Sequence, residues 1–256
     1  MKMVVLLVRV MALCLGVDLL FWDGAVAQEG WYWQNPLPQG NILKAVSFTD
    51  ANTGTVVGAS GTILRTTDAG ATWVRHWSGT TSGLYAVSFT DATTGTVVGA
   101  SGTILRTTDA GATWVRQSSG TMSGLYAVSF TDANTGTAVG DSGTLLRTTD
   151  GGATWVIQSS STSNWLRGVS FTDASTGTAV GGYGTIVRTT DGGATWVRHW
   201  SGTEYWLSAV SFTDANTGTV VGASGTILRT TDAGATWVRQ SSGTMSGLYA
   251  VSFTDA

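Results

Sequence analysis

The chain carries few of the side chains that hydrolytic chemistry needs. Most glycosidases place two carboxyl groups beside the bond that breaks, and unlike surroundings push their pKa values apart. Glu29 and Glu204 are the only glutamates. Nearly every aspartate recurs at the same position of a repeating sequence, which supplies little of that asymmetry. We therefore predict no catalytic residue and no enzyme activity.

The chain also has few side chains that could bind a metal or a cofactor. His76 and His199 occupy the same position in copies of the repeat that lie 123 residues apart, so they are not expected to share a metal. Asp50-Ala-Asn52 has the spacing of a calcium loop, but no bidentate carboxylate follows it. The one cysteine, Cys14, precedes the predicted mature chain. We predict no metal site and no cofactor.

Five arginines recur at regular intervals, and each lies three residues before the aspartate of a recurring turn. One interpretation is a basic ring that grips an acidic partner. The other, which we favour, is a strand side chain that pairs with a neighbouring carboxylate or stacks on a tryptophan. The series consists of Arg65, Arg106, Arg147, Arg188 and Arg229.

These side chains are positioned by a repeat of 41 residues. Leucine opens each copy, at Leu43, Leu84, Leu125, Leu166, Leu207 and Leu248. Within a copy, short runs rich in Val, Ile, Thr and Phe alternate with Gly, Asp and Ser turns, which predicts four strands. Four strands in about 40–45 residues is the size of a propeller blade. We predict an all-β fold, a β-propeller of four-stranded antiparallel blades, in preference to a parallel β-helix.

The boundaries of the propeller follow from the same periodicity. Residues 31–35 lie in phase with the fourth strand and are predicted to close the last blade. The copy that opens at Leu248 reaches only its first strand by Ala256. We therefore expect a propeller over 28–256, with five complete copies and an incomplete sixth. Such a chain is predicted to be a fragment of a six- or seven-bladed ring.

The first 27 residues have the features of a signal peptide. Lys2 supplies a positive charge, an apolar run follows, and Ala25-Val26-Ala27 is a small-residue cleavage site. The expected location is the periplasm, a thylakoid lumen or the extracellular space, without a membrane-embedded segment. A net charge of −3 with no cluster of Lys and Arg argues against nucleic acid as a partner.

The turn between the third and fourth strands reads Thr66-x-Asp68-x-Gly70-x-Thr72-Trp73 and recurs in every complete copy. It resembles the Asp-box, or bacterial neuraminidase repeat. We interpret its aspartates and tryptophans as structural, because the carboxylate can accept turn amides and the indole can be buried. These residues are Asp68, Trp73, Asp109, Trp114, Asp150, Trp155, Asp191, Trp196, Asp232 and Trp237.

A narrower resemblance covers nearly the whole mature chain. The pattern Ala-Val-Ser-Phe-x-Asp, Gly-x-x-Val-Gly, Gly-Thr-Ile-Leu-Arg-Thr-Thr-Asp is similar to the photosystem II assembly/stability factor family. That resemblance implies a lumenal propeller that assists assembly of the reaction centre. Similar repeats occur in exported proteins of bacteria that are not photosynthetic, so it implies an exported binding propeller most directly.

Differences between copies fall mainly on one face of the predicted propeller. This face is formed by the turns between the second and third strands and by the linkers between blades, and exposed aromatic and Arg side chains are typical of binding hot spots. We predict that it binds a protein or peptide. Its candidate residues are Lys44, Trp77, Tyr85, Tyr126, Trp165, Arg167, Tyr183, Trp200, Glu204, Tyr205 and Trp206.

Two other functions compete with this one. Exposed tryptophans suit stacking on sugars, which gives a carbohydrate-binding or sialidase-like glycosidase propeller with a glycan as partner. A surface adhesion array of repeats is the third alternative.

Overall fold

The computed structural model describes residues 40–253. This part contains five four-stranded antiparallel sheets, and its only helical segments are three 3-10 turns. Every sheet consists of four strands that are consecutive in the chain. Each complete copy of the repeat therefore forms one blade, as the sequence predicts.

The strands keep the same bounds from one copy to the next. The first sheet has β1 (Leu43–Phe48), β2 (Gly54–Gly58), β3 (Thr62–Thr66) and β4 (Val74–His76), and the second has β5 (Leu84–Phe89), β6 (Gly95–Gly99), β7 (Ile104–Thr107) and β8 (Val115–Gln117). The third has β9 (Leu125–Phe130), β10 (Gly136–Gly140), β11 (Leu145–Thr148) and β12 (Val156–Gln158). The fourth has β13 (Leu166–Phe171), β14 (Gly177–Gly181), β15 (Ile186–Thr189) and β16 (Val197–His199), and the fifth has β17 (Leu207–Phe212), β18 (Gly218–Gly222), β19 (Ile227–Thr230) and β20 (Val238–Gln240).

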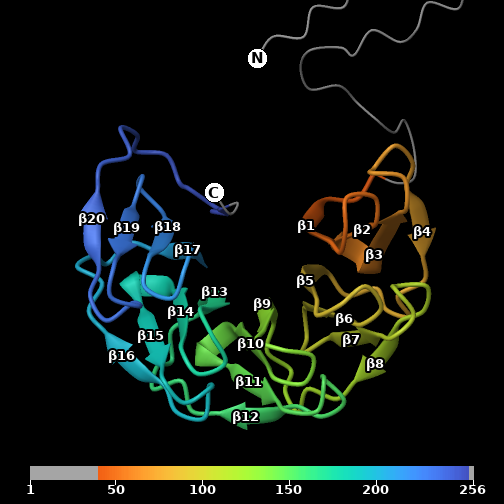
Figure 1. Cartoon of the computed structure of the whole chain (residues 1–256), viewed down its shortest axis with the longest axis horizontal. Helices are drawn as coiled ribbons and strands as arrows, with labels where there is room; N and C mark the ends of the chain where they lie inside the picture. Colours follow the sequence, from red (N-terminus) through yellow and green to blue (C-terminus); the bar gives the residue numbers. More distant parts are fainter. Residues whose placement is uncertain (1–39, 254–256) are drawn as a thin grey trace, which may run out of the picture. The chain divides into compact units, whose positions relative to one another are not determined.

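The sheets follow one another around an arc (Figure 1). The first strands β1, β5, β9, β13 and β17 contact one another in that order and form the inner side of the arc. The short fourth strands lie on the outer side. This radial order of strands places the start of each copy at the centre and its Asp-box tryptophan nearer the rim.

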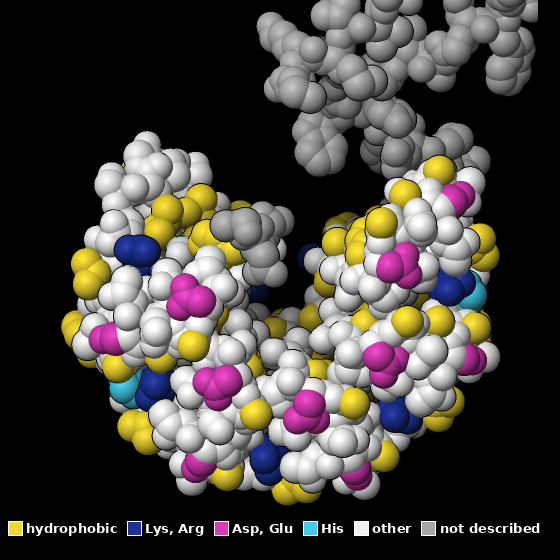
Figure 2. Space-filling view, viewed as in Figure 1, with side chains coloured by type: hydrophobic (Ala, Val, Ile, Leu, Met, Phe, Trp, Pro, Cys, Tyr) yellow, Lys and Arg dark blue, Asp and Glu magenta, His cyan; other side chains and the backbone are white. Residues whose placement is uncertain are grey.

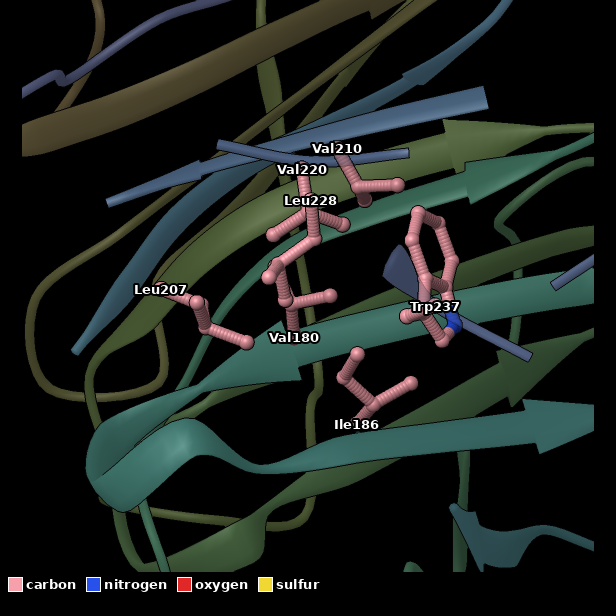
Figure 3. Packing of buried hydrophobic residues seen from close by; sticks show 7 residues of the cluster. All are labelled: Val180, Ile186, Leu207, Val210, Val220, Leu228 and Trp237. Carbon is pink, nitrogen blue, oxygen red and sulfur yellow. The ribbon is translucent and has the colours of Figure 1, made fainter. Parts of the chain in front are cut away.

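The core lies between neighbouring sheets. Figure 3 shows the contact between the fourth and fifth sheets, where two side chains of one sheet meet five of the next: Val180 and Ile186 against Leu207, Val210, Val220, Leu228 and Trp237. The same arrangement recurs between the other neighbouring sheets. Burying this apolar surface at each junction, at about 25 cal/mol per Å², is what stabilises the array.

The first sheet has one face that no described sheet covers, and its exposure shows how much a junction between sheets buries. Leu43 is 47% exposed, whereas its equivalents Leu84, Leu125, Leu166 and Leu207 are all 0% exposed. The difference arises because no described sheet covers that side of β1.

The sixth copy differs from its prediction. Residues 248–253 form no strand, although the Leu248 amide donates to the Gly222 carbonyl at 2.9 Å. A first strand is held by its pairing with a second, and among residues 40–253 no second strand of this copy is present. The predicted closing strand at 31–35 and the predicted signal peptide at 1–27 lie outside the described residues.

Candidate partner-binding site

The Asp-box turn is held together by one carboxylate. In the first copy, Asp68 accepts hydrogen bonds from the Thr72 amide at 2.8 Å, the Thr72 hydroxyl at 2.6 Å and the Thr66 hydroxyl at 2.7 Å. The Thr66 hydroxyl also accepts the Gly70 amide at 2.9 Å. These bonds favour the charged carboxylate and lower the pKa of Asp68 to about 2. The hydrogen bond from the Thr72 hydroxyl contributes most to this shift.

The same network recurs in the other four complete copies. The pKa of Asp109, Asp150, Asp191 and Asp232 is also held at about 2, in each case chiefly by the hydroxyl of the following threonine. A general acid in hydrolysis needs a raised pKa. These carboxylates are therefore turn-forming groups, in agreement with their structural interpretation.

Four of the five Asp-box tryptophans are buried. Trp155, Trp196 and Trp237 are buried and donate their indole N–H to the carbonyl three residues earlier, at 3.1–3.2 Å. The buried Trp114 indole nitrogen has no partner. Trp73 is only half-buried because it lies in the uncovered first sheet.

The predicted assignment of turns to faces agrees with the hydrogen bonds. The Ala69 amide of the Asp-box turn donates to the Asn52 carbonyl of the first hairpin at 2.9 Å, so these two turns lie together. At the other end of the sheet, the Gly61 amide donates to the Ser82 carbonyl of the linker at 2.8 Å. Asp50 accepts the amides of its own hairpin turn at 2.7 and 2.8 Å. Its carboxylate is thus engaged by turn amides.

Three of the five regular arginines make a contact that neither sequence interpretation names. The Arg106 Nε donates to the Gly151 carbonyl at 2.6 Å, and Arg147 donates to the Gly192 carbonyl at 2.7 Å. Arg188 repeats the contact with the next sheet. Each of these arginines therefore links its sheet to the Asp-box turn of the following one. The Asp-box carboxylates are already occupied within their own turns, which explains why the arginines bind carbonyls.

The two histidines make a related contact. Nδ1 of His76 lies 3.2 Å from the Ala112 carbonyl, and Nδ1 of His199 lies 3.1 Å from the Ala235 carbonyl. Both acceptors belong to the next sheet. The histidines are half-buried rather than freely exposed, and among residues 40–253 no three His, Cys, Asp or Glu side chains form a group that could hold a metal.

A cavity of about 630 Å³ lies at the end of the inner strands where the linkers meet. It contains the side chains that the sequence places at the start of the first strands, which are Lys44, Tyr85, Tyr126, Arg167 and Ser208. We call this cavity the channel mouth. Its lining also includes Ala223, Gly247 and Tyr249, which the prediction did not name. The size falls within the range of small-ligand and peptide pockets, about 300–1,000 Å³.

Arg167 is the central charged group of the channel mouth. Its guanidinium carbon lies 5.0 Å from the ring centre of Tyr126, 5.2 Å from that of Trp206 and 5.6 Å from that of Trp165. Cations are attracted to aromatic faces at such distances. Its Nε is buried without a hydrogen-bond partner. The cation is thus held by rings while keeping a donor unused.

Tyr126 connects the cation to a second, stacked tyrosine. Its ring lies 5.4 Å from that of Tyr85 at an angle of 23°. Its hydroxyl donates to Asp141 at 2.7 Å, and Asp141 also accepts the Gly124 amide at 3.0 Å. Burial, followed by the hydrogen bond to Asp141, raises the pKa of Tyr126 to about 12. Tyr126 is therefore a protonated donor whose ring is fixed in place.

The remaining candidates lie away from the channel mouth. Trp77 and Trp200 are 81% and 77% exposed in linkers at the rim, so the structure does not bring them to the central cavity. Tyr183, Glu204 and Trp200 share a smaller rim pocket of about 280 Å³. Tyr205 lies 5.9 Å from the guanidinium of Arg239. The predicted face is thus divided into a central part and a peripheral part.

The face opposite the channel mouth is uniform. Figure 2 shows acidic side chains that recur at intervals around the arc without gathering into one patch. Among residues 40–253, no helix is long and apolar enough to cross a membrane.

Five four-stranded antiparallel blades, each with an Asp-box turn between its third and fourth strands, define an Asp-box β-propeller. The sequence profile described as "Photosynthesis system II assembly factor YCF48" matches residues 25–116, 117–198 and 157–245. The chain belongs to this YCF48 family. Among curated protein sequences, none matches it.

Solved structures agree with the fold. A structure of "YCF48 bound to D1 peptide" has a TM-score of 0.51 and 18% identity, over 86% of this chain and 87% of that one. YCF48 from Cyanidioschyzon merolae has a TM-score of 0.57 and 21% identity, over 86% and 92% of the two chains. A GH74 enzyme from Niastella koreensis has a TM-score of 0.64 and 17% identity, but this chain spans only 38% of it. At these identities the likenesses show the fold alone.

Proposed function

We propose that this protein is a non-enzymatic binding propeller that holds a polypeptide segment of a complex during assembly. The observation that carries the proposal is the channel mouth, where side chains that differ between otherwise similar copies meet around Arg167. Arginine and large aromatic side chains contribute most of the energy of protein recognition. A buried donor without a partner favours a ligand that supplies an acceptor.

The partner is a segment of a photosystem II subunit, or of a corresponding membrane complex. Membership of the YCF48 family supports this choice. So does the similar YCF48 that is bound to a D1 peptide. An extended peptide offers carbonyl and carboxylate acceptors for Arg167, and its side chains can stack on Tyr85.

The test is a binding titration. Fluorescein-labelled D1 peptide is titrated with the full chain and with Arg167→Gln, and fluorescence anisotropy is recorded. A library of random twelve-residue peptides displayed on phage is selected in parallel, because it requires no knowledge of the natural partner. We expect saturable binding or an enriched sequence that Arg167→Gln weakens about tenfold or more, the loss of one charge-assisted hydrogen bond.

Two results would contradict the proposal. One is the absence of D1-peptide binding together with no enriched sequence from the library. The other is binding that Arg167→Gln leaves unchanged while the thermal midpoint also stays unchanged.

A non-enzymatic role is supported by the state of the carboxylates. Each Asp-box aspartate is engaged by its own turn and has a lowered pKa, which is the opposite of what a general acid requires. We expect the fluorophore to be released from fluorogenic sialosides and β-glucosides at the same rate with the protein as in buffer alone. A rate that depends on the protein and disappears in a variant of any single aspartate would establish an enzyme instead.

Export is part of the proposal. The apolar N-terminal segment and the Ala25-Val26-Ala27 sequence support cleavage before Gln28. Amino-terminal sequencing of protein collected from the periplasm or medium of an expression host tests this directly. Protein that stays in the cytoplasm with an intact Met1 would refute it.

A further inference from the structure

A second pocket lies at the fourth sheet, and most of its lining differs from the equivalent residues of the other copies. This pocket of about 350 Å³, which we call the aromatic notch, is lined by Ser163, Asn164, Trp165, Gly182, Tyr183 and Trp206. We infer that the aromatic notch is a specificity subsite that receives one large apolar side chain of the bound polypeptide. The inference deepens the proposed function and depends on it.

Four of the six lining residues differ from most of their equivalents, which are small except for Ile42 and Asp141. Trp165 and Trp206 stand where Gly83, Gly124 and Gly247 precede the leucine of their copies. Tyr183 stands where Ser60, Ser101, Ser142 and Ser224 occur, and Gly182 stands where Ala59, Ala100 and Ala223 occur. The other copies form the same sheet without these side chains. The fold therefore does not require them.

The Trp206 ring contacts both of the other rings that line the pocket. Trp165 and Trp206 lie 5.5 Å apart at 78°, and Tyr183 lies 6.1 Å from Trp206. Tyr183 has a φ of 53°, in the left-handed region that bulky residues rarely adopt, and its side chain is 64% exposed. A large ring displayed on a strained backbone, largely in solvent, is a feature of recognition rather than of the core.

The chemistry of the walls selects a neutral apolar group. No charged side chain lines the notch. The guanidinium of Arg167 lies against the rings of Trp165 and Trp206, which disfavours a second cation there. Two polar groups of the lining are already paired, since Asn164 donates to the Thr185 hydroxyl at 2.8 Å and the Gly182 amide donates to the Trp165 carbonyl at 2.8 Å. A ligand group gains by burying apolar surface and needs no hydrogen bond.

The notch adjoins the channel mouth. Trp206 lines both cavities, and Tyr183 lines both the notch and the rim pocket that contains Glu204. A segment held at Arg167 can therefore run outward across the fourth sheet, with one side chain entering the notch. This arrangement gives two-point recognition, in which the channel mouth fixes the segment and the notch selects its sequence.

The other copies supply variants that the fold is known to accept. A Cβ at Gly182 would lie 3.8 Å from the Trp206 ring, an ordinary contact, so Gly182→Ala partly fills the notch with the residue that three other copies carry. Trp77→Ser is the control, because Trp77 lines neither the channel mouth nor the notch and is exposed in a linker of another sheet, and because the second, third and fifth copies carry serine there.

The experiment selects the twelve-residue phage library on the full chain, on Gly182→Ala and on Trp77→Ser. We expect peptides enriched on the unmodified chain to share one position occupied by Leu, Ile, Met, Phe or Trp. Replacing that residue by Ala should weaken binding about tenfold to hundredfold, the effect of burying a large apolar side chain. Gly182→Ala should shift that position to smaller residues, keep the rest of the shared sequence and weaken the original peptide about tenfold. Trp77→Ser should change nothing.

The outcomes separate this inference from the proposed function. A shared sequence that depends on Arg167 but has no apolar position, or an apolar position insensitive to Gly182→Ala, overturns the subsite alone. The absence of any enriched sequence overturns the proposed function and the subsite together. An unchanged thermal midpoint of Gly182→Ala shows that its effect on binding is local.

Discussion

The two faces of this propeller are built from the same repeat. The Asp-box motif residues of one face are the same in every complete copy, whereas many residues of the other face differ from copy to copy. On the Asp-box face, each turn uses the same aspartate, threonines and glycine with nearly identical distances. On the channel-mouth face, equivalent positions hold Lys44, Tyr85, Tyr126, Arg167 and Ser208. The difference indicates that one face supports the structure of every blade while the other is free to vary, so stability and recognition are separable here.

The largest effect should come from the buried Asp-box tryptophans. Trp196 is 3% exposed and lies 5.9 Å from Phe171 in an edge-to-face contact. Trp196→Ala should lower the free energy of unfolding by about 3–5 kcal/mol, because it leaves a cavity between sheets. Urea denaturation measures this. The exposed Trp200, changed to Ser, should stay within about 0.5 kcal/mol. Equal losses in both variants would remove the distinction between the faces.

Acid should act on the Asp-box face as a group. The folded pKa of each Asp-box carboxyl is about 2, below its ordinary value of 3.8, so the unfolded chain binds protons first as pH falls. Stability should be constant from pH 7 to about pH 5 and fall progressively as pH drops from about 4 to about 2. The urea midpoint measured across this range tests the prediction. A midpoint that is still unchanged at pH 2 would contradict it.

A smaller effect is expected from the arginine links between sheets. Arg147→Ala removes the bond to the Gly192 carbonyl and should cost about 1–2 kcal/mol of unfolding free energy. Arg65→Ala is the matched control, because the buried Arg65 Nε has no partner. The loss in Arg65→Ala should be smaller. Equal losses would mean that packing of the arginine stem, and not the hydrogen bond, matters.

The smallest effect should come from the aromatic notch. Tyr183→Ser restores the residue that four other copies carry at a similar left-handed φ. The free energy of unfolding should therefore change by no more than about 0.5 kcal/mol. Thermal or urea denaturation is sufficient to measure it. A loss above about 1 kcal/mol would show that Tyr183 is part of the core of its sheet.

Much of the fold could be predicted because the same pattern of strand and turn residues occurs in five complete copies. The spacing of the leucines gives the length of a blade, and the alternation of strand and turn residues gives its four strands. The same strand directions place Lys44 and Arg167 at one end, and the structure finds them in one cavity. The strand predicted to begin at Leu248 does not form in residues 248–253, because a strand depends on a partner strand as well as on its own sequence.

The role of the regular arginines could not be predicted. Their sequence neighbourhood shows a carboxylate three residues away, whereas their acceptor is a carbonyl about 45 residues further on. The grouping of Trp165, Tyr183 and Trp206 around one pocket was also not visible, although each was named as a candidate. The differences between copies name these three residues, but they do not show that the side chains meet at one pocket.

The link from Arg147 to the Gly192 carbonyl gives the array a direction. Each of these three contacts runs from one copy to the one that follows it, so the third and fourth sheets offer a donor on one side and an acceptor on the other. A duplicate of either copy inserted beside it meets the neighbours that it already fits. Growth of the protein by gene duplication thus needs no new contact to evolve, which leaves later mutation free to alter single copies.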